Sequence, residues 1–319
     1  MNIQRIDYNI SLLRDIAIIC IILHHTLTIY TGWPPNHIVN TELPAYMLII
    51  SQLLKGLGLG TFTFISGYLM FNQSKKKYPF KLFAKTKAQR LLYPLVVFGV
   101  AYQILFPSFM LPFWPTPFNG THLWYLPMLF ICMMITSVDL YLKKPKIWLA
   151  VIYLCILCIN QFISFRTFLE LSKYLPLFMT GYFFNKYQFN IIIKQSNNLI
   201  FNILVTSWGG VWIILLYNDI HLKGITQLYF SCIFTYFLLI KYRKNTPLSK
   251  FGSLISNQSF TIYILHQFII NFLLLVINFN EKKWILSFII VSTLSFLLPL
   301  FIGNIYTQIR YKLSKKYKK

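Results

Sequence analysis

Long runs of apolar residues, separated by short polar connections, fill the chain from end to end. A helix needs roughly 20 apolar residues to cross about 30 Å of hydrocarbon, and most of the runs reach or approach that length. The pattern predicts an all-α fold, namely a polytopic transmembrane helical bundle of about ten spans. The expected spans are residues 11–31, 46–71, 91–109, 123–142, 147–163, 174–187, 198–217, 225–240, 259–278 and 284–306.

The second of these runs contains Lys55 followed by Gly56, Gly58 and Gly60. This sequence predicts a short interfacial helix that runs into a span. No appended soluble domain is expected anywhere, so residues 1–319 are predicted to form one integral membrane domain.

Composition supports a membrane protein. Of the 319 residues, 56% are apolar, 18% are aromatic and 12% are charged, whereas a soluble domain is about 45–50% apolar and about 25% charged. The five cysteines all lie inside apolar runs and lack the spacing of metal ligands. Neither a disulfide framework nor a metal site is therefore expected.

The net charge of +23 is unevenly distributed along the chain. If the N-terminus is inside, most lysines and arginines fall in inner connections. The outer connections then hold only Arg166, Lys173, Lys223, Lys282 and Lys283. Cytoplasmic loops carry such an excess of basic residues. We therefore expect cytoplasmic N- and C-termini, a basic tail at 307–319, and placement in the inner (cytoplasmic) membrane. The basic cytoplasmic loop at 72–90 is expected to be partly helical along the membrane surface. The expected partner of this charge is anionic lipid rather than nucleic acid.

The first run, RDIAIICIILHH, contains an arginine and two histidines. A helix turns by about 100° and rises about 1.5 Å per residue, so eleven steps bring His25 to within about 20° of Arg14 and roughly 16 Å away along the axis. The two side chains are predicted to share a face, with Arg14 near the cytoplasmic end and His25 past the middle of the span. His24 is turned away from that face by about 80°.

Two interpretations of this face stay open. Taken singly, Arg14 would snorkel to lipid headgroups and His25 would be a core histidine bonded to a backbone carbonyl. Taken together, an arginine suits a phosphate near the inner surface, and a histidine suits a general base near neutral pH. The pair would then serve a donor whose phosphates lie inside and whose reactive end enters the membrane.

Four further segments accompany the pair of Arg14 and His25 in the same order along the chain. They are FTFISGYLMF (62–71), KLFAKTKAQRLLYPLVVF (81–98), HLWYLPMLF (122–130) and SFTIYILHQFII (259–270). As an ordered set, covering essentially the whole chain, they resemble the membrane-bound acyltransferase family 3, of the surface-polysaccharide O-acetyltransferase type.

The resemblance implies transfer of an acyl group, most often acetyl from acetyl-CoA, to a hydroxyl of a cell-surface or lipid-linked glycan. It implies that Arg14 and His25 are catalytic, and that Arg14, Arg90, Lys85 and Lys87 bind the donor. It also implies a set of substrate or pathway residues, namely Ser66, Tyr68, His122, Trp124, Tyr263 and His266. No metal is implied.

The chain departs from the family pattern at two places. Many members carry an aspartate three residues before the arginine, where this chain has Ser11. One large subgroup carries an acid soon after the WxL of the fourth span, where this chain has Pro127 and Met128. The chain therefore resembles the shorter subgroup without that acid.

Simpler interpretations stay open for the other polar residues. His122 and Trp124 would form an interfacial aromatic belt. His266 would make a polar hydrogen bond between helices. Arg90 would be one of the basic residues that only set the membrane orientation. Asp139 is expected to pair with the nearby Lys143 and Lys144. For the whole protein, the alternatives to an enzyme are a glycan or lipid-linked sugar exporter and a structural membrane scaffold.

Overall fold

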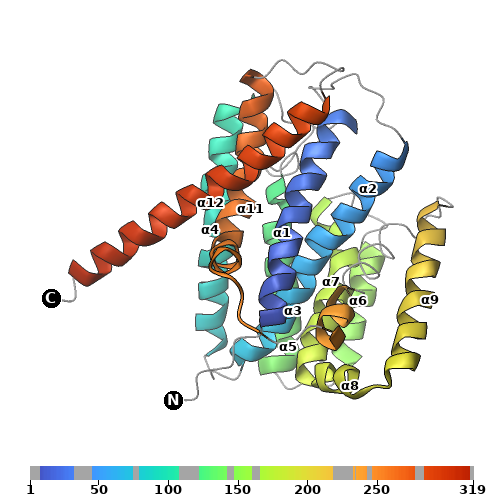
Figure 1. Ribbon diagram of the computed structural model, residues 1–319. Helices are drawn as coiled ribbons and strands as arrows, with labels where there is room; N and C mark the ends of the chain where they lie inside the picture. Colours follow the sequence, from blue (N-terminus) through green and yellow to red (C-terminus); the bar gives the residue numbers. More distant parts are fainter. Residues whose placement is uncertain are drawn as a thin grey trace. The chain divides into compact units, whose positions relative to one another are not determined.

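The computed structural model describes residues 8–31, 45–74, 79–107, 122–141, 147–159, 166–217, 233, 235–242, 246–276 and 284–316. Within these ranges every regular element is helical and no strand occurs, as Figure 1 shows. The prediction of an all-α fold is confirmed.

The chain divides into two compact units. The first comprises Met1–Gly58 and Tyr242–Lys319, and the second comprises Leu59–Lys241. Each is described by itself below.

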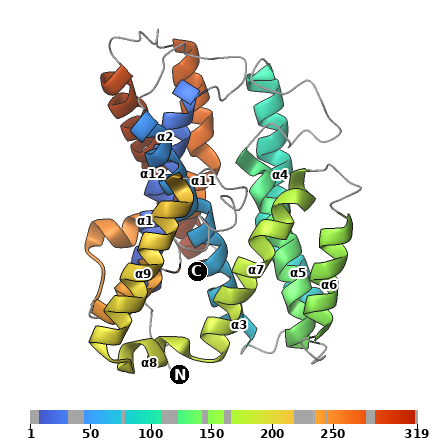
Figure 2. The same ribbon diagram turned by 90° about the vertical axis from the view of Figure 1, so that its right-hand side faces the viewer.

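Four helices form the described part of the first unit: α1 (Tyr8–Thr28), α2 (Ala45–Lys55), α11 (Lys250–Val276) and α12 (Trp284–Lys316). Helix α1 packs against the other three, and α11 packs against α12 (Figures 1 and 2). The buried side of α1 carries small and branched apolar residues, including Leu13, Ala17 and Ile18. Helix α1 therefore supplies the centre of this unit's core.

The approach of α2 to α1 depends on one of the glycines noted in the sequence. Residues Gly56–Gly60 form a π-helical turn between α2 and α3, so the expected interfacial helix runs directly into the next helical segment. A Cβ at Gly58 would come within 2.6 Å of Ile21 Cγ1 on α1. Only glycine allows this contact without a shift of the isoleucine.

The second unit contains α3 (Thr61–Ser74), α4 (Phe80–Leu105), α5 (Tyr125–Tyr141), α6 (Ile147–Ile159), α7 (Arg166–Lys186), α8 (Phe189–Gln195) and α9 (Asn198–Tyr217). Helix α7 packs against α3, α5 and α6 (Figure 2). It is thus the helix on which the neighbouring helices of this unit converge.

In the part of the chain that the structure describes, six helices are long and apolar enough to cross a membrane. They are Tyr8–Thr28, Ile50–Asn72, Phe80–Leu105, His122–Tyr141, Lys250–Val276 and Trp284–Ser314, and each overlaps an expected span. Helix α6 is a shorter apolar helix at another expected position. Most of the expected span 225–240 lies outside the described residues.

Two helices extend farther than the apolar runs indicated. Helix α4 begins at Phe80, so the second half of the expected basic loop at 72–90 is helical. Helix α12 continues to Lys316, and its C-terminal part projects beyond its own unit (Figure 1). Lysine and arginine are good helix formers, so a charge that ends an apolar run does not end a helix.

Candidate active site

Arg14 joins α1 to α11. Its Nε donates to Ser256 Oγ at 3.1 Å, and its Nη2 also contacts that hydroxyl. Ser256 is buried in the second turn of α11. The guanidinium therefore has a fixed polar contact inside the first unit rather than the free orientation of a purely snorkelling side chain.

His25 faces the same helix farther along. Its ring centroid lies 5.2 Å from that of His266 on α11. Since Arg14 and His25 both contact α11, they share a face of α1, as their spacing predicted. The pairings Arg14 with Ser256 and His25 with His266 also show that α1 and α11 run parallel.

His266 is completely buried, with an exposed fraction of 0%. Its Nδ1 lies 2.7 Å from the carbonyl oxygen of Tyr263 and 3.1 Å from that of Ile262. Carbonyl oxygens only accept hydrogen bonds, so Nδ1 carries the hydrogen and Nε2 is an acceptor in the neutral ring. The ring of Tyr263 lies 6.0 Å from that of His266. The structure thus brings His266, a predicted pathway residue, next to His25, and Tyr263 next to His266.

His24 contacts a different helix from His25. Its Nδ1 lies 3.0 Å from both the carbonyl oxygen and the hydroxyl of Ser51 on α2. The rings of His24 and His25 are 5.3 Å apart because the residues are adjacent in sequence. The orientation of His24 away from α11 agrees with its position on the helical wheel.

Sequence reasoning missed Ser256, the polar partner of Arg14. A signal for it exists: Ser256, Ser259, Tyr263 and His266 follow one another at intervals of three and four in an otherwise apolar helix. Such spacing places polar side chains on one side of a helix. This polar stripe of α11 is the surface against which Arg14 and His25 pack.

Predicted pathway residues of the second unit lie in its interior. Tyr68 is buried, and its ring lies 6.0 Å from that of Tyr236. His122 and Trp124 are 4% and 7% exposed, and their rings lie 6.4 Å from Tyr102 and 5.9 Å from Tyr174, respectively. An interfacial belt needs side chains that face lipid, so this burial argues against the belt interpretation.

Ser66, on α3 beside Tyr68, is half-buried. A substrate role for it and for the other predicted pathway residues of this unit stays a prediction.

The basic residues predicted to bind the donor lie in the first turns of α4. Lys85 and Arg90 are exposed. Lys87 is buried, with its Nζ 5.4 Å from the centre of the Phe83 ring. Binding of a phosphate by these residues together with Arg14 stays a prediction.

Asp139 has a different partner from the one expected. Lys186 on α7 forms an ion pair with Asp139 at 2.5 Å, and the Tyr182 hydroxyl donates to the same carboxylate oxygen at 2.7 Å. Lys143 and Lys144 lie outside the described residues. The Asp139 carboxylate therefore links α5 to α7. The distance between these residues in the sequence gives no sign of this contact.

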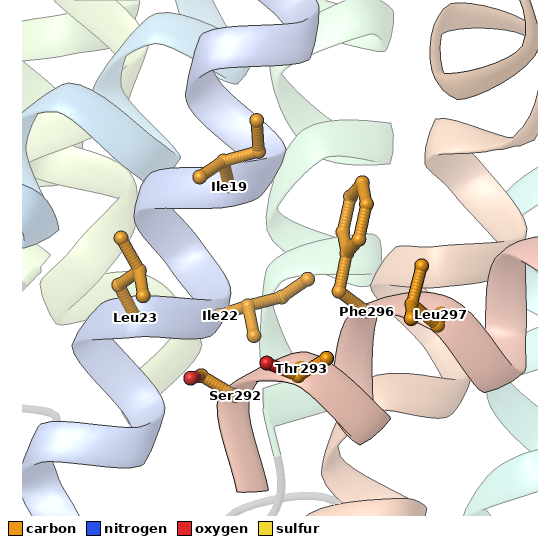
Figure 3. A pocket seen from close by; sticks show the side chains of 7 residues that line it. All are labelled: Ile19, Ile22, Leu23, Ser292, Thr293, Phe296 and Leu297. Carbon is orange, nitrogen blue, oxygen red and sulfur yellow. The ribbon is translucent and has the colours of Figure 1, made fainter. Parts of the chain in front are cut away.

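Helices α1 and α12 line an open pocket of about 260 Å³ between Ile19, Ile22 and Leu23 on one side and Ser292, Thr293, Phe296 and Leu297 on the other (Figure 3). Around α1, Ile19 and Leu23 point about 120° and 160° away from His25, and Ile22 about 60° away. The pocket thus lies mainly on the side of α1 away from the face that carries Arg14 and His25.

The geometry agrees with a comparison against known families. A family model described as an acyltransferase domain, that of the acyltransferase 3 family, matches residues 7–304. The chain belongs to the acyltransferase 3 family. No curated protein and no solved structure gives a significant match. Since the match covers nearly the whole chain, the protein is an acyltransferase with a multi-pass membrane fold, and an exporter is not favoured.

Proposed function

We propose that this acyltransferase moves an acetyl group from acetyl-CoA to a hydroxyl of a cell-surface or lipid-linked glycan. The observation that supports this proposal most directly is the common orientation of Arg14 and His25 toward α11. An anion-binding group and a general base then lie along one helix face, at the two ends of a path roughly 16 Å long.

The donor enters from the cytoplasm in this proposal. Coenzyme A carries phosphates, which suit a guanidinium because it presents several donors in one plane. Arg14 in the first unit would hold them, and Lys85, Lys87 and Arg90 in the second unit are proposed separately as donor-binding residues. This arrangement uses the expected topology of about ten spans with both termini cytoplasmic in the inner membrane, which follows the excess of basic residues in inner connections.

The reaction is carried by His25. One imidazole nitrogen takes the proton of the acceptor hydroxyl while the oxygen attacks the thioester carbonyl. The tetrahedral intermediate expels the coenzyme A thiolate, which receives that proton from His25, and the acceptor keeps the acetyl group as an ester. The apolar helices around α1 exclude the water that would otherwise hydrolyse the thioester. The reaction needs no metal.

The exporter alternative would need a coupling acid inside a span. Among the six described candidate spans, acidic side chains occur only at Asp15 and Asp139. Asp139 is held by Lys186 and Tyr182, and Asp15 lies near the start of α1. This distribution favours the enzyme.

The decisive experiment uses a deletion strain complemented with wild type, His25→Ala or Arg14→Ala. Base-labile acetyl groups on the surface glycan are quantified by proton NMR, and membrane abundance of each variant is measured. We expect wild type to restore acetyl and both variants to fail at equal abundance. Full restoration by His25→Ala would overturn the mechanism. A change in the amount of exported glycan, with unchanged acetylation, would favour the exporter.

A further inference from the structure

A histidine that acts as a general base is normally oriented by a second group, most often a carboxylate. In the described residues of the first unit the only carboxylate is Asp15, ten positions before His25 on the same helix. Ten residues correspond to about 15 Å along the axis. Asp15 is therefore too far from His25 to orient its ring.

The group that does lie beside His25 is His266, with ring centroids 5.2 Å apart and planes inclined by 44°. The two rings are in contact, but no hydrogen bond joins them in this structure, so a hydrogen bond between them would need a small rotation of the His25 ring. The orientation of the His266 ring is fixed, because its Nδ1–H lies against the carbonyl oxygens of Tyr263 and Ile262. Its other nitrogen, Nε2, is consequently an acceptor.

We propose that His266 is a positioning residue for His25 and replaces the carboxylate of a conventional base-and-orienter pair. This inference rests on the proposed function and names a group that acts through His25 rather than on the substrate. Its acceptor nitrogen would favour one orientation of His25 once that ring rotates to donate to it. It would also stabilise the imidazolium that forms when His25 takes the hydroxyl proton, because a buried acceptor lies next to the new positive charge.

The neutral acceptor also accounts for the rigid placement of His266. A flipped ring would turn its N–H toward His25, and two donors facing each other would repel. The two carbonyl contacts from α11 prevent that rotation, and complete burial excludes water as a competing donor. The first unit thus contains a base, an orienting acceptor and the backbone groups that fix the acceptor.

The test measures acetyl transfer in membrane vesicles from the complemented deletion strain, with radiolabelled acetyl-CoA as the donor and the native glycan as acceptor. We expect His266→Ala to lower kcat by about 10²-fold, the usual scale of a general-base effect, with the KM for acetyl-CoA unchanged. His266→Gln should recover part of kcat, because its amide oxygen is an acceptor.

Gln267→Leu is the matched control, since Gln267 is equally buried on the same helix and donates to Asn271 Oδ1 at 2.9 Å. It reports the general cost of disturbing this part of α11. A change confined to KM, or an equal fall in kcat for Gln267→Leu, would overturn the proposal. Membrane abundance identifies variants that fail to fold. If His266→Ala is one of them, the kcat of His266→Gln tests the proposal in its place. If wild type transfers no acetyl, the proposed function itself has failed.

Discussion

Gly67 on α3 and Gly181 on α7 lie where the two helix backbones come closest in the second unit. A Cβ at Gly67 would overlap the carbonyl oxygen of Phe178, and a Cβ at Gly181 would overlap that of Phe64. The relationship is reciprocal, so each glycine makes room for the backbone of the other helix. Small residues allow such close approach in membranes, where packing drives helix association. Gly67, in a segment that resembles a family motif, is therefore structural.

Replacement of either glycine by alanine is expected to destabilise the protein. The added methyl group meets backbone atoms, which cannot rotate away, and overpacking of this kind costs about 1–3 kcal/mol. Thermal unfolding of purified protein in detergent should show a lower Tm for Gly67→Ala and Gly181→Ala. Gly210→Ala is the control, because nothing lies within 4 Å of its added Cβ. That variant should be neutral or more stable, and equal losses at all three positions would contradict the prediction.

Ser256→Ala should impair use of the donor without abolishing the reaction. Ser256 accepts from Arg14 at 3.1 Å and so orients the guanidinium. A hydrogen bond to a charged group is worth about 1.5–3 kcal/mol, so the KM for acetyl-CoA should rise on the order of tenfold while kcat changes little. Steady-state kinetics in membrane vesicles measure both.

Ser253→Ala provides the comparison for Ser256→Ala. Ser253 lies one turn earlier on α11 and is exposed, and its hydroxyl donates to the carbonyl of Lys250 in its own helix. The KM of this variant should equal that of wild type. If Ser253→Ala raised the KM as much as Ser256→Ala does, the contact with Arg14 would not be the cause.

The ion pair of Asp139 and Lys186 should behave as a coupled unit. The pair is partly buried, since the Lys186 and Asp139 side chains are 28% and 8% exposed, so loss of one partner should cost less than the about 3–5 kcal/mol of a fully buried pair. Lys186→Met should therefore lower the Tm, and Asp139→Asn combined with Lys186→Met should recover part of the loss. The more exposed pair of Lys173 and Glu170, with side chains 39% and 23% exposed and a separation of 3.3 Å, gives the contrast. Glu170→Gln should cost less than about 1 kcal/mol, and simple additivity of the Asp139 and Lys186 changes would contradict the coupling.

The helices were predictable from the sequence because apolar runs of membrane-spanning length leave few alternatives. The shared face of Arg14 and His25 was also predictable, since helical geometry alone determines it. The partners of Arg14 and His25 on other helices were not predictable from the sequence. Arg14 and Ser256 are 242 positions apart, and the rotation of α11 about its axis depends on packing against α1 and α12. The residue at which α4 begins, Phe80, was not predictable, because the polar segment before it contains good helix formers and no apolar boundary.

The two adjacent histidines of α1 should respond differently to substitution. His24 Nδ1 bonds to Ser51 on α2, whereas His25 faces His266 on α11. His24→Asn keeps an amide donor near Ser51 and leaves the α11 face intact, so surface-glycan acetylation should stay close to wild type. His25→Asn removes the base and should abolish acetylation. Proton NMR of the isolated glycan, with membrane abundance measured in parallel, separates the two. Loss of acetylation in His24→Asn with retention in His25→Asn would assign the chemistry to the face that packs on α2.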